Sequence, residues 1–388
     1  MATAQLTRRG TTSPLRASCQ VARLDSLAEV DALEPAWEAL ELHGPMLEFP
    51  WIRAALSAFG AEEIPRLLVA RQGARLAALA PLIGKRILGI RRLQFAGASE
   101  LTEPMDFAWS DRAALASLIK SLLDQRQPIL LDRVSATSET LAPLRRACQG
   151  RAIIVTRPRP GTPYLTLDES WLEPEQHLLP DHRATLRRAR RQAERMGAVS
   201  TEIHSPSLHE LPELLDTAFE VEPLQRLSEV EAARALERAV FIRHYAAAAC
   251  AAGNLRVCFL RIGSRVAAMQ LAVECSGSFW LLASAHRSVP NAIVTPHDSH
   301  FAGCWPDLLL ARETIAYAAA ASLDHYEFLG HAASWNSWWT STSRPCLSLR
   351  IYPFGLRSLA AMLLDAAAAG YARWQQPATQ WVVAMLSS

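Results

Sequence analysis

The sequence lacks the short motifs that mark several common enzyme classes. It has no G-x-S-x-G elbow, no P-loop and no G-x-G-x-x-G, so hydrolase, nucleoside triphosphatase and dinucleotide-binding functions have no local support. Its seven cysteines contain no C-x-x-C pair, which argues against a zinc ribbon and a disulfide framework. The simplest compartment for such a chain is the cytoplasm.

An excess of charge and a long apolar run are also lacking. The chain has 40 basic and 38 acidic residues, so net charge points to no particular partner. The longest apolar stretches, LAAMLLDAAAAG and WVVAMLSS near the C-terminus, are too short to cross a bilayer core of about 30 Å, and no membrane span is predicted. The twin arginine near the N-terminus is followed by polar GTTSP, which predicts a loose tail over residues 1–20 rather than a secretory signal.

The length of the chain and an internal repeat predict a duplicated fold. A chain of 388 residues is longer than one compact core usually grows, so two domains are expected. The segment RQGARLAA at 71–78 recurs as RIGSRVAA at 261–268, with five of eight positions identical. Both copies lie between short apolar runs, and a central glycine supplies the positive φ of a tight turn. The pattern predicts one β-hairpin in each of two related halves.

The residues after the second hairpin predict an ordered series of elements. A strand over 278–283 and a polar loop are followed by a helix over 306–322, which begins at Pro306 and Asp307. A strand over 324–330, a short helix at WNSWWTS and a last strand at CLSLRIYP complete the series. Alanine-rich helices are expected over 231–252 and 359–373.

This order resembles the C-terminal core of the GNAT acyltransferases. The nearer resemblance is to the GNAT-type proteins of bacterial polysaccharide clusters, the cellulose-biosynthesis acyltransferases, which are grouped with the tandem Fem-type aminoacyl transferases. It spans residues 201–354 and is thinner in the N-terminal half, where it rests on Trp37, Trp51, the first hairpin, Pro81-Leu82 and Gly97. The motifs that carry it are Gly253-Asn254-Leu255-Arg256, Met269-Gln270, Leu308-Leu309-Leu310, Glu313-Thr314-Ile315, Glu327-Phe328-Leu329-Gly330, Trp335, Trp338-Trp339-Thr340 and Leu349-Arg350-Ile351-Tyr352-Pro353.

The resemblance implies an α/β (α+β) fold of tandem GNAT-like domains, each a mixed, mostly antiparallel sheet flanked by helices. The expected divisions are a flexible tail over 1–20, an N-terminal half over 21–170, an arginine-rich connecting helix over 171–200, a C-terminal acyltransferase half over 201–356 and a helical extension over 357–388.

The resemblance also implies a reaction. An acyl group would move from acyl-coenzyme A, as co-substrate and without a metal, to an amine or hydroxyl of a saccharide or small metabolite.

Three family patterns are changed in this chain: Leu224-Gln225 follows Glu220 in place of Trp-Lys, Ala285-His286-Arg287 replaces Tyr-Asp-Glu, and Trp305-Pro306-Asp307 replaces Ser-Pro-Gly. Two alternatives therefore stay open, namely aminoacyl transfer from charged tRNA and a catalytically degenerate scaffold.

Acyl transfer needs a base for the acceptor, and two residues are candidates. Glu327 is expected on a strand that borders the cleft, where burial would raise its pKa; the alternative is an ion pair with an arginine. His286 is expected at the end of the central strand; the alternative is an ordinary polar side chain. The predicted donor-binding residues are Arg287, Asp307, Leu308, Trp335 and Asn336, and the predicted acceptor-binding residues are Glu220, Gln270 and Trp339.

Most of the donor-binding candidates have a physical reason. The helix start at Asp307 and Leu308 offers free N–H groups for phosphate, although the Asp307 carboxylate would itself cap them and repel an anion, which Arg287 could offset. The tryptophans after Gly330 could clamp a ligand or pack in the core.

Two further features that could bind a ligand are a basic helix and a pair of histidines. The run RATLRRARRQAERMG over 183–197 could receive coenzyme A phosphate, an acyl carrier protein or tRNA, or be a solvated connector. His297 and His300 of HDSH have no third ligand in register, so no metal is expected.

Overall fold

The computed structural model describes residues 19–40, 42, 44–59, 64–221, 229–287, 301, 303–330 and 335–375. The expected tail, the HDSH segment, Leu224-Gln225 and Ser334 lie outside these residues, apart from the end of the tail at 19–20. Among the described helices, none combines the length and apolar character that a bilayer crossing requires.

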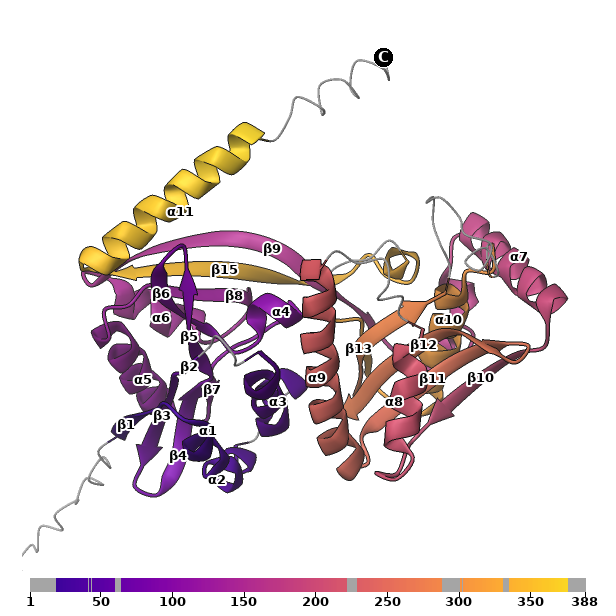
Figure 1. Ribbon diagram of the computed structural model, residues 1–388, viewed down its shortest axis with the longest axis horizontal. Coiled ribbons are helices and arrows are strands. Elements are labelled where there is room, and N and C mark those ends of the chain that lie inside the picture. Colours follow the sequence, from indigo (N-terminus) through magenta and orange to yellow (C-terminus); the bar gives the residue numbers. More distant parts are fainter. Residues whose placement is uncertain are drawn as a thin grey trace, which may run out of the picture.

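The described strands form one antiparallel sheet and one larger mixed sheet, flanked by helices (Figure 1). The smaller sheet has the order β1 (Cys19–Leu24), β3 (Leu67–Gln72), β4 (Arg75–Ala80), β7 (Ala108–Trp109). The larger sheet has the order β10 (Val199–His204), β11 (Leu255–Ile262), β12 (Arg265–Cys275), β13 (Ser278–His286), β14 (His325–Glu327), β9 (Ala152–Thr166), β15 (Ser343–Pro353), β8 (Ile129–Ser135), β6 (Ile90–Phe95), β5 (Leu82–Ile87), β2 (Ile64–Pro65). Pairing is antiparallel except for β6 with β8 and β13 with β14 in this part of the chain.

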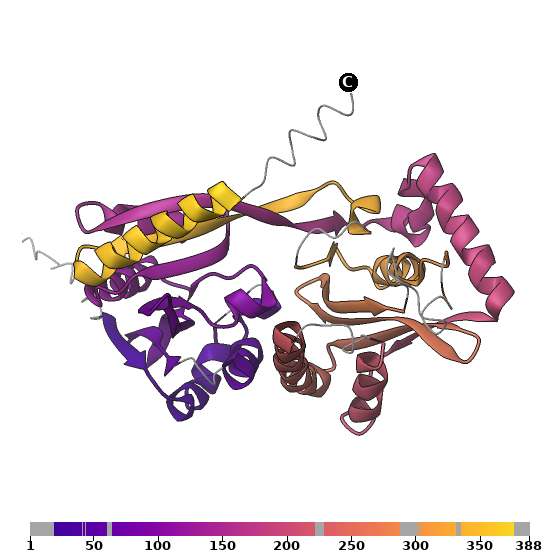
Figure 2. The ribbon, with the colours of Figure 1, turned by 45° about the horizontal axis from the view of Figure 1, so that its top comes forward.

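Helices cover both halves, and their ends follow from local sequence. The N-terminal half has α1 (Leu27–Asp31), α2 (Glu34–Glu38), α3 (Phe49–Phe59), α4 (Ala98–Leu101), α5 (Arg112–Asp124) and α6 (Leu141–Cys148). The C-terminal half has α7 (Pro180–Met196), α8 (Leu211–Phe219), α9 (Glu229–Ala251) and α10 (Pro306–Ala320), and α11 (Leu356–Gln375) follows. Proline occupies the first turn of α7 and α10, where the missing N–H costs nothing. In the C-terminal half, α8 and α9 cover one face of the sheet and α7 and α10 the other (Figure 2).

The repeated octapeptide forms the two expected hairpins. Strands β3 and β4 turn at Gly73, whose φ is +63°, and β11 and β12 turn at Gly263, whose φ is +62°. Each hairpin has a register shift just before its first arginine, between Ala70 and Arg71 and between Leu260 and Arg261. The duplication therefore extends to the β-bulge as well as to the turn.

Two long strands join the halves. The last residues of β9, from Tyr164 to Thr166, pair with β14 of the C-terminal half, and the rest of β9 pairs with β15. The last strand was expected to complete the C-terminal half; instead β15 pairs with β8 and β9 in the N-terminal half. The reason is that β14 already pairs with the last residues of β9. The next strand, β15, therefore pairs along the rest of β9, toward the N-terminal half.

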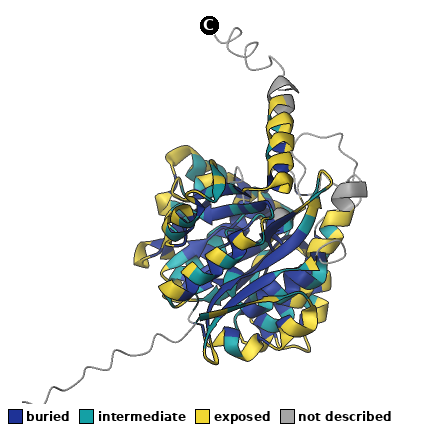
Figure 3. Cartoon of the chain, turned by 90° about the vertical axis from the view of Figure 1, so that its left-hand side faces the viewer, coloured by how far each residue is buried: buried dark blue, intermediate teal, exposed yellow. Residues whose placement is uncertain are grey.

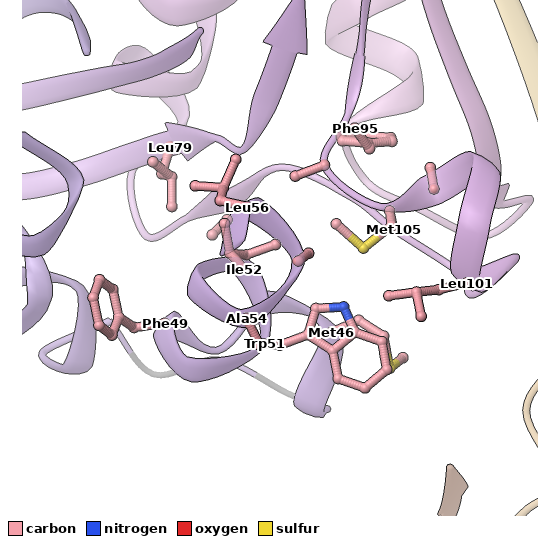
Figure 4. Close-up of a cluster of buried hydrophobic side chains, with 14 of the residues drawn as sticks. Met46, Phe49, Trp51, Ile52, Ala54, Leu56, Leu79, Phe95, Leu101 and Met105 are labelled. Atoms are coloured by element: carbon pink, nitrogen blue, oxygen red, sulfur yellow. The ribbon is translucent and has the colours of Figure 1, made fainter. Parts of the chain in front are cut away.

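The hydrophobic core also crosses between the halves. Trp51 of α3, 2% exposed, packs edge to face against Phe241 and Tyr245 of α9, with ring centroids 4.9 and 5.0 Å apart. Figure 4 shows Trp51 among the buried side chains of the N-terminal half. A second cluster of buried side chains lies between α10 and the C-terminal sheet.

Candidate active site

The site begins where two parallel strands separate. Strands β13 and β14 pair only from Ser278 to Trp280, and α10 connects them. Beyond Trp280 the strands diverge and leave a cleft of about 270 Å³, which we call the interhalf cleft. Both halves line it, with Leu101, Thr102 and Glu103 from the N-terminal half and Arg238, Leu281, Leu282, Ala283, Ser284, Phe328, Leu329, Gly330, Trp335 and Asn336 from the C-terminal half.

The equivalent opening in the N-terminal half is filled by its own chain. There β6 and β8 pair in parallel at Leu93 and Gln94 and then separate. Leu101 and Met105, which are 5% and 3% exposed, pack into this region, with Met105 between Phe95 and Leu101 (Figure 4). The segment that fills the N-terminal opening therefore presents its polar residues Thr102 and Glu103 to the cleft of the other half.

Glu103 is a buried carboxylate at the wall of the interhalf cleft. Its side chain is 4% exposed, and its Oε2 accepts a hydrogen bond of 2.8 Å from the Gly330 N–H. Burial raises the pKa of Glu103 to about 7, although the Gly330 N–H and the charges of Arg238 and Arg133 act in the opposite direction. A carboxylate with a pKa near neutrality is suited to general base catalysis.

An unusual turn positions the partner of Glu103. Leu329 and Gly330 both have left-handed backbones, with φ of +49° and +63°, and a leucine in this conformation costs about 1 kcal/mol or more. The turn directs the Gly330 N–H toward Glu103, while the Gly330 carbonyl accepts a hydrogen bond of 2.9 Å from Arg133. Arg133 also donates to the Pro160 carbonyl at 3.1 Å, so strand β9 helps to fix the site.

The wall opposite Glu103 is a strand edge. In the described residues no strand pairs with β13 beyond Trp280 on the side of β14, and Leu281, Leu282 and Ser284 line the cleft. Arg238 donates a long hydrogen bond of 3.4 Å to the Leu282 carbonyl. Such an edge can pair with an extended molecule that carries amide groups.

The predicted base Glu327 takes part in an ion pair. Its carboxylate is 2% exposed and accepts a hydrogen bond of 2.6 Å from the Arg344 guanidinium. Arg344 in turn lies over the Tyr164 ring, 3.9 Å from its centroid. Glu327 is not among the residues that line the interhalf cleft, so the geometry matches the ion-pair alternative.

The predicted base His286 lies at the end of β13, outside the cleft lining. Its Nδ1 is 3.8 Å from Oδ2 of Asp307, which is 6% exposed at the start of α10. Oδ1 of Asp307 is buried without a hydrogen-bond partner among the described residues. The Asp307 carboxylate therefore lies at the start of α10, where the free backbone N–H groups were predicted to bind phosphate.

The other predicted residues fall into separate groups. Trp335 and Asn336 line the interhalf cleft. Arg287 donates a hydrogen bond of 2.9 Å to the backbone carbonyl of Glu220, so these two predicted residues do meet. The remaining side chains, those of Gln270, Leu308 and Trp339, are buried.

Gln270 belongs to a hydrogen-bond network within the core. Its Oε1 accepts hydrogen bonds from the Thr314 hydroxyl at 2.8 Å and the Tyr326 hydroxyl at 3.3 Å. The network ties β12 to α10 and β14, beneath the point where the strands separate.

Glu103, Arg133 and Arg238 were not predicted from the sequence. Glu103 lies in the segment LTEPMD, which has neither a periodic pattern nor a recognisable motif. The signal that could have found it is the duplication itself, since the first hairpin predicts a second splayed pair of strands and a segment that follows it.

Comparisons with known proteins agree with this architecture. Residues 180–337 match the family profile described as "Acetyltransferase (GNAT) domain", so α7 lies at the start of the matched domain. No sequence among the curated proteins matches the chain.

Several solved structures are similar to this chain over most of its length. A conserved protein of unknown function from Bacteroides thetaiotaomicron is 12% identical, with a TM-score of 0.52, over 86% of this chain and 100% of that one. The structure of FemX is 10% identical, with a TM-score of 0.52, over 89% of this chain and 100% of that one. A tandem GNAT protein from the clavulanic acid biosynthesis pathway is 11% identical, with a TM-score of 0.44, over 87% and 99% of the two chains. At these identities the first two show a shared fold and leave the activity open.

Proposed function

We propose that the protein transfers an acyl group from acyl-coenzyme A to an amine or hydroxyl in the interhalf cleft, with Glu103 as the general base. The observation that carries the proposal is a nearly fully buried carboxylate, with a pKa of about 7, that faces lining residues of the region 180–337, which matches an acetyltransferase domain. The acceptor is a small metabolite or a saccharide.

The cleft fits the reacting end of the donor. The amide groups of the pantetheine arm would pair with the free edge of β13 at Leu281–Ser284. A volume of about 270 Å³ holds a thioester and an acceptor group, while the nucleotide would lie outside. The start of α10 is a poor pyrophosphate site because Asp307 places a carboxylate there.

The reaction then follows from the geometry. Glu103 takes a proton from the acceptor, whose lone pair attacks the thioester carbonyl, and β13 N–H groups stabilise the oxyanion. The carbon–sulfur bond breaks as the tetrahedral intermediate collapses, and the departing thiolate takes a proton from water. Glu103 then releases its proton to the hydroxide that remains, which restores the base. The Gly330 N–H keeps the Glu103 carboxylate oriented between turnovers.

The test combines binding with turnover. Calorimetric titration with acetyl-coenzyme A should show micromolar binding to the wild type and to Glu103→Gln, because the thioester contacts β13 rather than the base. Release of free coenzyme A in the presence of a panel of amines and sugars should fall by about 100-fold or more in Glu103→Gln. Glu327→Gln is the matched control and should retain turnover. Absence of binding at millimolar acetyl-coenzyme A would overturn the proposal.

A second candidate function is suggested by the arginines of α7. Its Arg187, Arg188, Arg191 and Arg195 are exposed and contact no carboxylate among the described residues, which suits a phosphate backbone. Aminoacyl transfer from tRNA would then replace acyl transfer from coenzyme A, and Glu103 would keep its role. Salt-sensitive tRNA binding that is lost in Arg187→Gln/Arg188→Gln/Arg191→Gln would support it.

If neither donor binds, the catalytically degenerate scaffold becomes the preferred explanation. Turnover of any thioester would exclude that explanation.

A further inference from the structure

Helix α11 exposes its apolar face and buries its polar one. Leu356, Leu359, Leu363 and Leu364 are 87%, 49%, 61% and 38% exposed, whereas Ser358 and Asp365 are 1% and 8% exposed. Figure 3 shows α11 as a mostly exposed helix that extends from the body of the molecule. A row of exposed leucines on a folded protein is typical of a surface that another apolar body covers.

The buried polar side of α11 shows that this orientation is specific. Asp365 forms an ion pair of 2.6 Å with Arg92, which is 3% exposed, and accepts a hydrogen bond of 2.6 Å from the Tyr352 hydroxyl. Arg350 lies 3.2 Å from the same carboxylate. These contacts fix the rotation of the helix, so the leucines cannot turn inward without leaving Arg92 unpaired in the core.

The first turn of α11 borders a basic groove. This groove, of about 540 Å³, lies between α11 and the β5–β6 hairpin and is lined by Arg86, Arg91 and Arg357 together with Gly89, Ile90, Gln127, Leu356 and Ala360. We call it the arginine groove. None of the three arginines contacts a carboxylate within the described part of the chain. Leu88 at the hairpin tip is 60% exposed beside it.

We infer that α11 and the arginine groove bind an anionic membrane surface. The leucines would enter the boundary between headgroups and acyl chains, and the arginines would bind lipid phosphate groups. Charge complementarity favours a lipid surface over a second copy of this chain. The exposed face of α11 at residues 356–370 has no acidic side chain, since Asp365 is buried, so two such helices would cover the leucines and leave the arginines unneutralised.

The test uses the full chain and vesicles of two compositions. The protein should sediment with vesicles of phosphatidylcholine mixed with phosphatidylglycerol and stay in solution with phosphatidylcholine alone. Arg86→Gln/Arg91→Gln/Arg357→Gln should weaken binding on the order of 100-fold, and Leu359→Ser/Leu363→Ser should weaken it about tenfold or more. Neither leucine change touches the buried side of the helix, so folding is retained.

A matched control separates this surface from general basic charge. Arg145→Gln/Arg146→Gln/Arg265→Gln removes the same charge from exposed positions on α6 and β12, outside the proposed binding surfaces, and should leave vesicle binding unchanged. Equal loss in both triple variants would overturn the inference, as would absence of binding to the anionic vesicles. Sedimentation velocity without lipid measures the oligomeric state. If the protein is a dimer that Leu359→Ser/Leu363→Ser abolishes, and it does not bind vesicles, the leucines of α11 contact a second copy of the chain instead of a membrane.

Discussion

At the scale of single residues, Glu103 controls both the chemistry and its pH dependence. A base must be deprotonated to act, and the pKa of Glu103 is raised to about 7 by burial. We therefore expect kcat/KM to rise tenfold per pH unit below about pH 7 and to level off above it. In Glu103→Gln this rise should disappear, whereas Glu327→Gln should keep it. A pH–rate profile for the three proteins measures this, and an unchanged profile in Glu103→Gln would remove Glu103 from the mechanism.

The same residue should limit stability in alkaline solution. The folded-state pKa of Glu103 is about 7 and the unfolded value is 4.5, so the folded state binds the extra proton and stability falls as pH rises between these values. Above pH 7 the cost is on the order of 3 kcal/mol. Glu103→Gln should thus be more stable than the wild type at pH 8 and equal to it at pH 4. Urea unfolding at the two pH values checks this, and equal stability at pH 8 would contradict it.

At the scale of elements, Asp365 attaches α11 to the N-terminal half. Burial alone would raise the pKa of Asp365, but the hydrogen bonds from Arg92 and Tyr352 outweigh it and lower that pKa below its usual value. Asp365→Ala leaves Arg92 buried without its partner and should cost about 3–5 kcal/mol. The contribution of the wild-type pair should also be lost as pH falls through the lowered pKa.

Hydrogen exchange distinguishes loss of this attachment from general unfolding. In Asp365→Ala, the amides of α11 should exchange faster, while those of β11 and β12 in the C-terminal core keep their protection. Asp365→Asn is the conservative comparison, since it retains the hydrogen bond from Tyr352 and should lose less. Uniform exchange across the molecule would show that Asp365 supports the whole fold rather than one helix.

At the scale of the whole molecule, the halves should unfold together. Strands β9 and β15 pass between them, and Trp51 of one half packs on Phe241 and Tyr245 of the other. Trp51→Ala should cost about 3–5 kcal/mol and lower a single thermal transition rather than split it. Calorimetry with and without the substitution measures this, with the partly buried Trp109→Ala as a milder comparison. Two separate transitions in the wild type would mean that the halves are thermodynamically independent.

Much of the fold could be predicted from local sequence, because its signals are local. The octapeptide repeat identified both hairpins, since a glycine with positive φ and flanking apolar runs specify a turn without reference to the rest of the chain. Pro306 and Asp307 identified the start of α10 in the same way. Trp335 and Asn336 were predicted to bind the acyl donor; both line the interhalf cleft, and their binding of the donor stays a prediction.

Only the tertiary structure decided where the acidic side chains act. Glu327 and Glu103 are both buried glutamates, and nothing in the neighbouring sequence shows that one faces Arg344 while the other faces a cleft. The pairing of β15 with the N-terminal sheet likewise depends on β9 already bordering β14. Hairpins and helix caps are set by residues a few positions apart, whereas burial, charge pairing and strand exchange depend on contacts between separate elements, which for Glu103 and Gly330 are 227 positions apart in the chain.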